Sequence, residues 1–314
     1  MSVRMKNNKV MTFSDSVRSA SAGRLGFFSM LLWALSIGML SGQEMDMEKT
    51  TIKPVKNTFE SVWLIDHQTV MVPIPGTFEF DIQHRFGTWD NGYDDFYGVF
   101  APSNIRIGLS YTPWDRISVG FGFTKQDLIW DGSAKVALLR QGVGGGSPVS
   151  LSYYTNVALD TRKEDKTDFE EGTDRWSFYH ELLVARKVTR SFSVQASGSL
   201  SWFNYKDQQY DVEGVPLGRD QNVQFAAGAL ARYKVTNTLG VIAAFDFPIT
   251  DQTFQDPEGN VSFGLEFVTS SHAFQVFVGN YKYLIPQYNS SFNTNSFGDN
   301  EILIGFNMTR LWNF

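Results

Sequence analysis

The chain has 314 residues, a formal net charge of −6 and no cysteine. The modest negative charge argues against a nucleic-acid partner, since nucleic-acid-binding proteins usually carry a basic face. The lack of cysteine excludes disulfides, thiolate metal sites and a lipoprotein anchor, and we expect neither a cofactor nor a bound metal ion.

The first predicted element is a secretory signal peptide at residues 1–42. Arg24 precedes an apolar run over residues 25–40, and the small residues Ser41 and Gly42 follow it. A positive charge, a short apolar core and a small-residue exit are typical of a cleaved leader. A membrane anchor is the alternative, but the run is short for a membrane span. We expect cleavage near Ser41 or Gly42.

Residues 43–75 are interpreted as a periplasmic N-terminal segment. Within it, residues 59–65 and 70–72 are apolar enough to require burial. Two placements stay open. The segment folds into a barrel lumen or covers its periplasmic mouth as a plug, or it forms an ordinary short strand at the periplasmic rim.

Apolar and polar residues alternate repeatedly between residues 76 and 314. In the first such stretch, Phe78, Phe80 and Ile82 alternate with Glu79 and Asp81. A period of two places the apolar and the charged side chains on opposite faces of a β-strand. The pattern predicts strands at 76–88, 103–112, 115–126, 129–140, 148–160, 174–187, 191–205, 222–234, 239–248, 260–269, 272–284 and 301–314.

Segments of about ten residues with this alternation, separated by turn residues, are typical of outer-membrane barrels. Short connections, such as residues 112–114 and 188–190, alternate with long ones, such as residues 88–102 and 206–221. This asymmetry places both ends of the barrel in the periplasm. We therefore predict an all-β fold for residues 76–314. It is a transmembrane antiparallel up-and-down barrel of about 12 strands in the outer membrane of a Gram-negative bacterium.

Tryptophans at the predicted strand ends support the membrane location, since amphipathic rings collect at membrane interfaces. Phe314 ends the last alternating strand and resembles the signal used by the outer-membrane assembly machinery. A soluble β-sandwich would explain the strands but not the leader, the loop asymmetry and these aromatic residues together. The predicted girdle consists of Trp89, Trp114, Trp130, Trp176, Trp202 and Trp312.

Four short motifs resemble a family of uncharacterised outer-membrane β-barrels that is known as a domain of unknown function. The motifs lie at residues 80–87, 104–109, 115–120 and 131–141, and the resemblance extends from about residue 59 to the C-terminus. It implies a barrel fold and an outer-membrane location. It implies no activity, and no functional residues are transferred from it.

Charged residues of both signs fall on the lumen side of the predicted strands. A selective ion pore usually concentrates one sign at its constriction, so near balance favours a hydrated interior with salt bridges. We expect Asp81 or Glu79 to pair with Arg106 on the next strand. The predicted lumen residues are Glu79, Asp81, Arg85, Arg106, Lys135, Glu181, Arg232, Asp246 and Glu266.

Three functions are compatible with this sequence. The preferred one is a passive or facilitated channel for small polar solutes, with outer-membrane lipid and the barrel assembly machinery as partners. The second is a closed barrel with a structural or binding role that docks a periplasmic protein through residues 43–75. The third is a lipid hydrolase using His84 or His180, which requires a serine and a carboxylate within hydrogen-bond reach. We expect no enzymatic activity.

Overall fold

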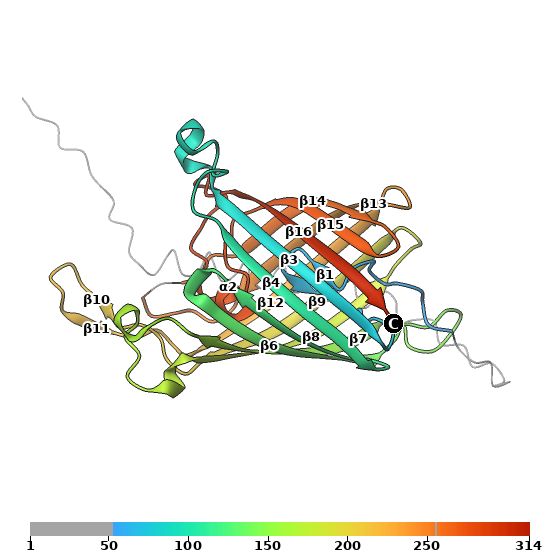
Figure 1. Cartoon of the computed structure of the whole chain (residues 1–314), viewed down its shortest axis with the longest axis horizontal. Coiled ribbons are helices and arrows are strands. Elements are labelled where there is room, and N and C mark those ends of the chain that lie inside the picture. The colour runs from blue at the N-terminus through green and yellow to red at the C-terminus, as the bar shows by residue number, and fades with distance from the viewer. Residues whose placement is uncertain (1–52, 255) are drawn as a thin grey trace, which may run out of the picture. The chain divides into compact units, whose positions relative to one another are not determined.

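The computed structural model describes residues 53–254 and 256–314, and the predicted signal peptide and residues 43–52 lie outside the described residues. Twelve strands close into one barrel in which every strand pairs antiparallel with its neighbours along the chain. The last strand pairs with the first to complete the ring, with Trp312 opposite Phe78. The predicted all-β antiparallel barrel is confirmed, as Figure 1 shows.

Each predicted strand end lies within two residues of the observed end, with one exception, because alternation marks the membrane-crossing part of each strand directly. The barrel strands are β3 (Thr77–Thr88), β4 (Asn104–Trp114), β5 (Ile117–Thr124), β6 (Ile129–Leu139), β7 (Ser150–Asp160), β8 (Trp176–Lys187), β9 (Phe192–Phe203), β12 (Val223–Lys234), β13 (Leu239–Pro248), β14 (Asn260–Val268), β15 (His272–Gly279) and β16 (Leu303–Asn313).

The exception is the strand predicted at residues 272–284, which ends at Gly279. The chain then turns into the barrel and forms the short helix α2 (Pro286–Phe292), which begins with proline, a residue favoured in the first helical turn. Tyr281, Leu284 and Ile285 are buried, so the apolar residues that extended the predicted strand serve burial inside the barrel instead. The strand predicted at residues 272–284 was therefore too long at its C-terminal end.

The other connections on the end of the barrel opposite the C-terminus carry small elements (Figure 1). None of the helices in residues 53–254 and 256–314 is long and apolar enough to span a membrane. These elements are the 3-10 helices η1 (Trp89–Asp95), η2 (Gln126–Leu128), η3 (Glu164–Lys166) and η4 (Gly172–Arg175), and the hairpin of β10 (Gln209–Tyr210) and β11 (Pro216–Gly218).

The two faces of the barrel wall differ as the alternation predicts. On the outer face, Leu109 and Phe121 are 53% and 47% exposed, which suits a surface covered by lipid. On the inner face the side chains are polar and buried. Gly122 lies beside the guanidinium of Arg106 on the inner face: a Cβ at this position would lie 2.3 Å from Nη2, so any larger residue would displace the guanidinium.

The interior of the barrel is filled rather than empty. A hairpin of β1 (Trp63–Leu64) and β2 (His67–Gln68) lies inside it, and its Leu64 and Ile65 are fully buried. They belong to one apolar cluster with Tyr154 and Leu183 of the wall. The chain enters from the periplasmic side, where Pro54 pairs with Gly142 in the turn between β6 and β7.

Candidate functional site

The candidate site is the polar lumen. All nine charged residues predicted to line it lie on the inner face of the wall, and eight of them are buried; the side chain of Asp246 is 15% exposed. They divide into separate clusters, most of which contact the hairpin at residues 61–70. The nine are Glu79, Asp81, Arg85, Arg106, Lys135, Glu181, Arg232, Asp246 and Glu266.

Arg106 on β4 lies at the centre of the first cluster. Its Nε and Nη2 donate to both carboxylate oxygens of Asp131 on β6, at 3.0 and 2.8 Å, and its Nη1 donates to Asp81 on β3 at 3.0 Å. Planar two-point pairing of this kind is among the strongest ion-pair geometries. The guanidinium also lies over the ring of Trp63, 5.4 Å from its centre. The wall thus presents a neutralised cation to the hairpin.

Asp131 was missing from the predicted lumen residues, although a signal for it was present. It lies four residues before Lys135 on the same strand, so both side chains share one face.

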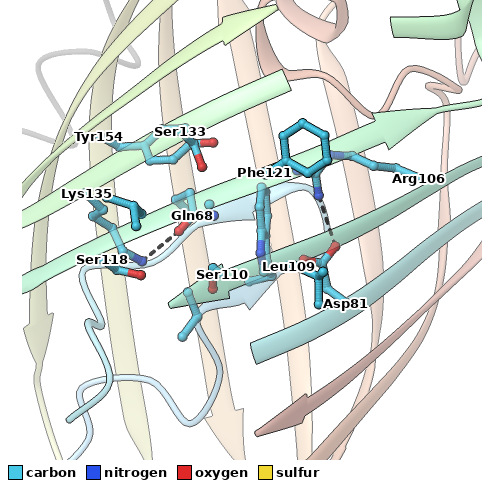
Figure 2. A pocket seen from close by; sticks show the side chains of 14 residues that line it. Gln68, Asp81, Arg106, Leu109, Ser110, Ser118, Phe121, Ser133, Lys135 and Tyr154 are labelled. Carbon is cyan, nitrogen blue, oxygen red and sulfur yellow. Dashed lines mark hydrogen bonds and ion pairs between the residues drawn. The ribbon is translucent and has the colours of Figure 1, made fainter. Parts of the chain in front are cut away.

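Lys135 connects the wall to the hairpin by polar contacts. Its Nζ donates to Oε1 of Gln68 at 2.6 Å and to the backbone oxygen of Thr69 at 3.1 Å. Figure 2 shows this contact beside the pair of Arg106 and Asp81. Both carboxylate oxygens of Glu79, which lies on the same side of the lumen, lack a hydrogen-bond partner.

Glu266 on β14 forms a third connection. It accepts a hydrogen bond from Arg232 of β12 and, on its other oxygen, from Ser61 of the hairpin segment at 2.6 Å. Gln275 of β15 donates to the same oxygen at 3.1 Å. The ion pair is therefore shared between the wall and the segment that fills it.

Amide side chains of the wall form hydrogen bonds with the backbone of residues 61–70, which we call the filling segment. Gln275 accepts from the backbone N–H of Ile65 at 2.8 Å and donates to the backbone oxygen of Trp63 at 2.8 Å. Gln195 makes the same two kinds of bond with Val70 and Gln68, at 2.9 and 2.8 Å. Buried backbone groups outside a sheet need such partners. Amide side chains of the wall thus bond to backbone groups of the segment that do not pair within the hairpin.

Arg85 is held differently from the other cations. Its Nη1 donates to Asn307 at 3.0 Å and its guanidinium lies 4.5 Å from the ring centre of Phe277. Its Nε and Nη2 have no hydrogen-bond partner. Glu266 and Lys135 form direct hydrogen bonds with the filling segment, and the Trp63 ring of this segment lies under Arg106. Arg85, in contrast, contacts the wall.

The segment that enters from the outer side meets the hairpin inside the barrel. Gln287 of α2 donates to Asn156 at 3.0 Å, and Ser290 bonds to Ser201 at 2.9 Å. Asn289 donates to Asp66, the residue at the tip of the hairpin. Segments that enter from both mouths of the barrel therefore contact each other inside it. Sequence reasoning missed this contact because both partners lie outside the repeated strands.

His67 follows Asp66 at this junction and faces Asp246 of β13. Burial alone would lower the pKa of His67, but the carboxylates of Asp246, Asp66 and Glu181 raise it to about 9. Glu181 lines the same small cavity as His67. Three acidic side chains thus surround a single imidazole.

The two histidines considered for catalysis lie on the lipid-facing side of the wall. Nδ1 of His180 lies 2.6 Å from the hydroxyl of Tyr153 and 3.2 Å from that of Thr155. His84 stacks on Phe306, with ring centres 5.1 Å apart. Within the part of the chain that the structure describes, neither histidine has a serine hydroxyl as a hydrogen-bond partner.

The predicted girdle residues lie at or next to strand ends. Trp89, Trp130, Trp176 and Trp202 lie toward the outer loops, and Trp114 and Trp312 lie toward the short turns. Phe314 follows β16 and is 90% exposed. Trp63 differs from them, because it is buried inside the barrel.

Comparison with known proteins gives the family. The sequence model of the family described as "Membrane bound beta barrel domain (DUF5777)" matches residues 59–312. No curated protein matches significantly in sequence.

Solved structures with a similar fold include three outer-membrane proteins. The NanC porin is 8% identical, with a TM-score of 0.45 over 76% of this chain and 99% of that one. An outer membrane channel from Pseudomonas putida F1 is 12% identical, with a TM-score of 0.47 over 77% and 97%. The KdgM porin is 8% identical, with a TM-score of 0.42 over 76% and 99%. Likeness at this level concerns the barrel alone and carries no information about a solute.

Proposed function

The chain belongs to the family of membrane-bound β-barrel domains known as DUF5777, and from its interior we propose an outer-membrane channel for small polar solutes that is closed at rest by residues 59–72. The observation that carries the proposal is the way this segment is held. Side chains of the wall bind it, while the twelve strands close without it.

A closed ring of strands has no edge that the hairpin must complete. The contacts of the segment are those of a bound ligand: hydrogen bonds from Gln275, Gln195 and Lys135, and burial of Leu64 and Ile65. Each hydrogen bond stabilises the closed state by only about 1 kcal/mol net. Release of the segment is therefore compatible with an intact wall.

The exposed lumen would then be polar and of mixed sign. Arg106 is already paired with Asp81 and Asp131, and Arg232 with Glu266. Paired charges offer hydrogen bonds without concentrating one sign at a constriction. Small polar molecules should pass with weak ion selectivity.

Single-channel conductance in a planar bilayer tests the proposal. The full chain should show rare openings, and a variant lacking residues 59–72 should conduct steadily, because the wall stays closed while the lumen empties. The matched control lacks residues 208–219, the outer hairpin, and should behave as the full chain. A folded variant lacking residues 59–72 that never conducts would refute the proposal.

A second function has one observation in its favour. Residues 53–57 lie at the periplasmic rim, where Nζ of Lys187 donates to the backbone oxygens of Lys56 and Asn57 at 3.2 and 2.8 Å. A barrel that serves as a docking platform for a periplasmic protein would present its N-terminal segment there. In that case, removing residues 53–57 should abolish capture of the partner and leave conductance unchanged.

A further inference from the structure

The junction inside the barrel brings together a nitrogen and two carboxylate oxygens of the kinds that bind transition metals. Nε2 of His67 lies 3.4 Å from Oδ1 of Asp66 and 3.2 Å from Oδ2 of Asp246. One ligand atom from each of the three residues lies within 4.8 Å of the others. Asp66 and His67 belong to the hairpin, whereas Asp246 belongs to β13 of the wall.

The spacing fits a metal ion at the centre. Zinc binds imidazole nitrogen and carboxylate oxygen at about 2.0–2.2 Å in tetrahedral geometry, which places neighbouring ligand atoms about 3.3–3.6 Å apart. The distance from His67 Nε2 to Oδ1 of Asp66, 3.4 Å, has this size, and the distance to Oδ2 of Asp246, 3.2 Å, is slightly shorter. Calcium and magnesium prefer all-oxygen sites, so the imidazole favours zinc or a similar first-row ion.

An unpartnered nitrogen points to the same conclusion independently. The side chain of His67 is 6% exposed, and its Nε2 makes no hydrogen bond although two carboxylates lie near it. An oriented N–H would satisfy at least one of them. Oδ1 of Asn289, which lines the same cavity, is also buried without a partner.

The carboxylates around the cavity outnumber the cations that act on them: three of them act on the single imidazole of His67, and Arg85 of the wall acts on Asp66. Asp66 accepts hydrogen bonds from Tyr281 at 2.6 Å and from Asn289, both of which are neutral. Glu181 and Asp246 act on His67 from the other sides. Buried carboxylates are costly unless a cation neutralises them. A divalent ion supplies two positive charges where a protonated His67 supplies one.

From these observations we infer that Asp66, His67 and Asp246 form a binding site for Zn²⁺ or a similar divalent transition-metal ion. Glu181 or a water molecule completes the coordination, and Tyr281 orients Asp66 from behind. The ion would join the hairpin to β13 at the point where the hairpin meets α2. The site does not depend on whether the barrel conducts.

Titration of the refolded full chain with Zn²⁺, followed by calorimetry, tests the site. We expect one ion per chain, with binding weakened at least about 100-fold in His67→Ala and in Asp246→Asn. Tyr281→Phe, which removes only the bond behind Asp66, should weaken binding about 10-fold. His180→Ala alters a lipid-facing histidine and should bind as the unaltered chain does.

Cobalt gives a second measurement in the same proteins. Co²⁺ at a site of nitrogen and oxygen ligands absorbs visible light, and the bands should be lost in His67→Ala and kept in His180→Ala. Heat-dependent migration on gels checks that each barrel is folded. Asp246→Asn changes charge without changing size, so it decides the matter if His67→Ala fails to fold. A folded full chain without one-to-one binding would overturn the inference, as would equal binding by folded Asp246→Asn.

Discussion

At the scale of single residues, Arg106 shows how the wall tolerates charge in its interior. It is buried between Asp81 and Asp131, and each of its bonds is close to 3 Å. A buried ion pair contributes little when compared with apolar residues of the same shape. Removal of one partner, however, leaves the others buried and uncompensated, which is costly.

Arg106→Ala should therefore lower the free energy of unfolding by about 3–5 kcal/mol. Two carboxylates would lose their cation, and Trp63 would lose the guanidinium over its ring. Urea unfolding of the barrel in detergent, followed by tryptophan fluorescence, measures the change.

The matched control is Arg116→Ala. Arg116 pairs with Asp115 at 3.6 Å, but their side chains are 48% and 59% exposed. Exposed pairs stabilise a fold by about 0–1 kcal/mol, so the control should unfold almost as the unaltered chain does. Equal losses in both variants would contradict the role assigned to Arg106.

At the scale of elements, the hairpin of β1 and β2 is too short to be stable alone. It forms because the wall supplies partners for its backbone and an apolar cluster for Leu64 and Ile65. Its geometry thus depends on side chains more than two hundred residues away in sequence, such as Gln275.

Gln275→Leu should raise the frequency with which the hairpin is released from the lumen. The change removes the two hydrogen bonds to the hairpin, together with those to Glu266 and Asn307 of the wall. Loss of partners for the N–H of Ile65 and the oxygen of Trp63 costs about 1–3 kcal/mol. The open fraction in single-channel records should rise by roughly 10- to 100-fold.

Gln209→Leu changes the same type of residue in the outer hairpin, far from the lumen contacts, and should leave the open fraction unchanged. A rise in both variants would point to a general loosening of the barrel instead.

At the scale of the whole molecule, the twelve-stranded wall surrounds the hairpin of β1 and β2. The hairpin is bound by the wall but forms a separate sheet. Wall strands bond to two neighbours each, whereas the hairpin depends on scattered side chains. Regions with fewer cooperative contacts open locally at a lower free energy than the global unfolding.

Amide hydrogen exchange should therefore separate the two parts. Backbone amides of residues 61–70 should exchange faster than those of β9 and β12, two wall strands that pair along nearly their whole length. Mass spectrometry of peptides from the refolded barrel measures both in one experiment. Equal protection of the two would mean that the hairpin and the wall open only together, and it would argue against a removable plug.

Most of the wall could be predicted from the sequence, because the period-two pattern is local. Alternation across Phe78, Glu79 and Phe80 states which side of a strand faces lipid without reference to any other strand. The same parity places the nine charged residues on the inner face, and it would have placed Asp131 there too. Short and long connections then order the strands into one ring.

The contents of the ring were decided only by the tertiary structure. Apolar residues 59–65 required burial, but their placement depended on amides and charges that the folded wall brings into the lumen. Residues 280–292 read as strand and loop, since nothing local distinguishes an apolar run that faces lipid from one that turns inward. The junction of Asp66, His67 and Asp246 joins positions about 180 residues apart. The wall follows from a pattern that repeats every two residues along the chain. The contacts inside the wall join residues far apart in sequence, so they exist only once the ring of strands has closed.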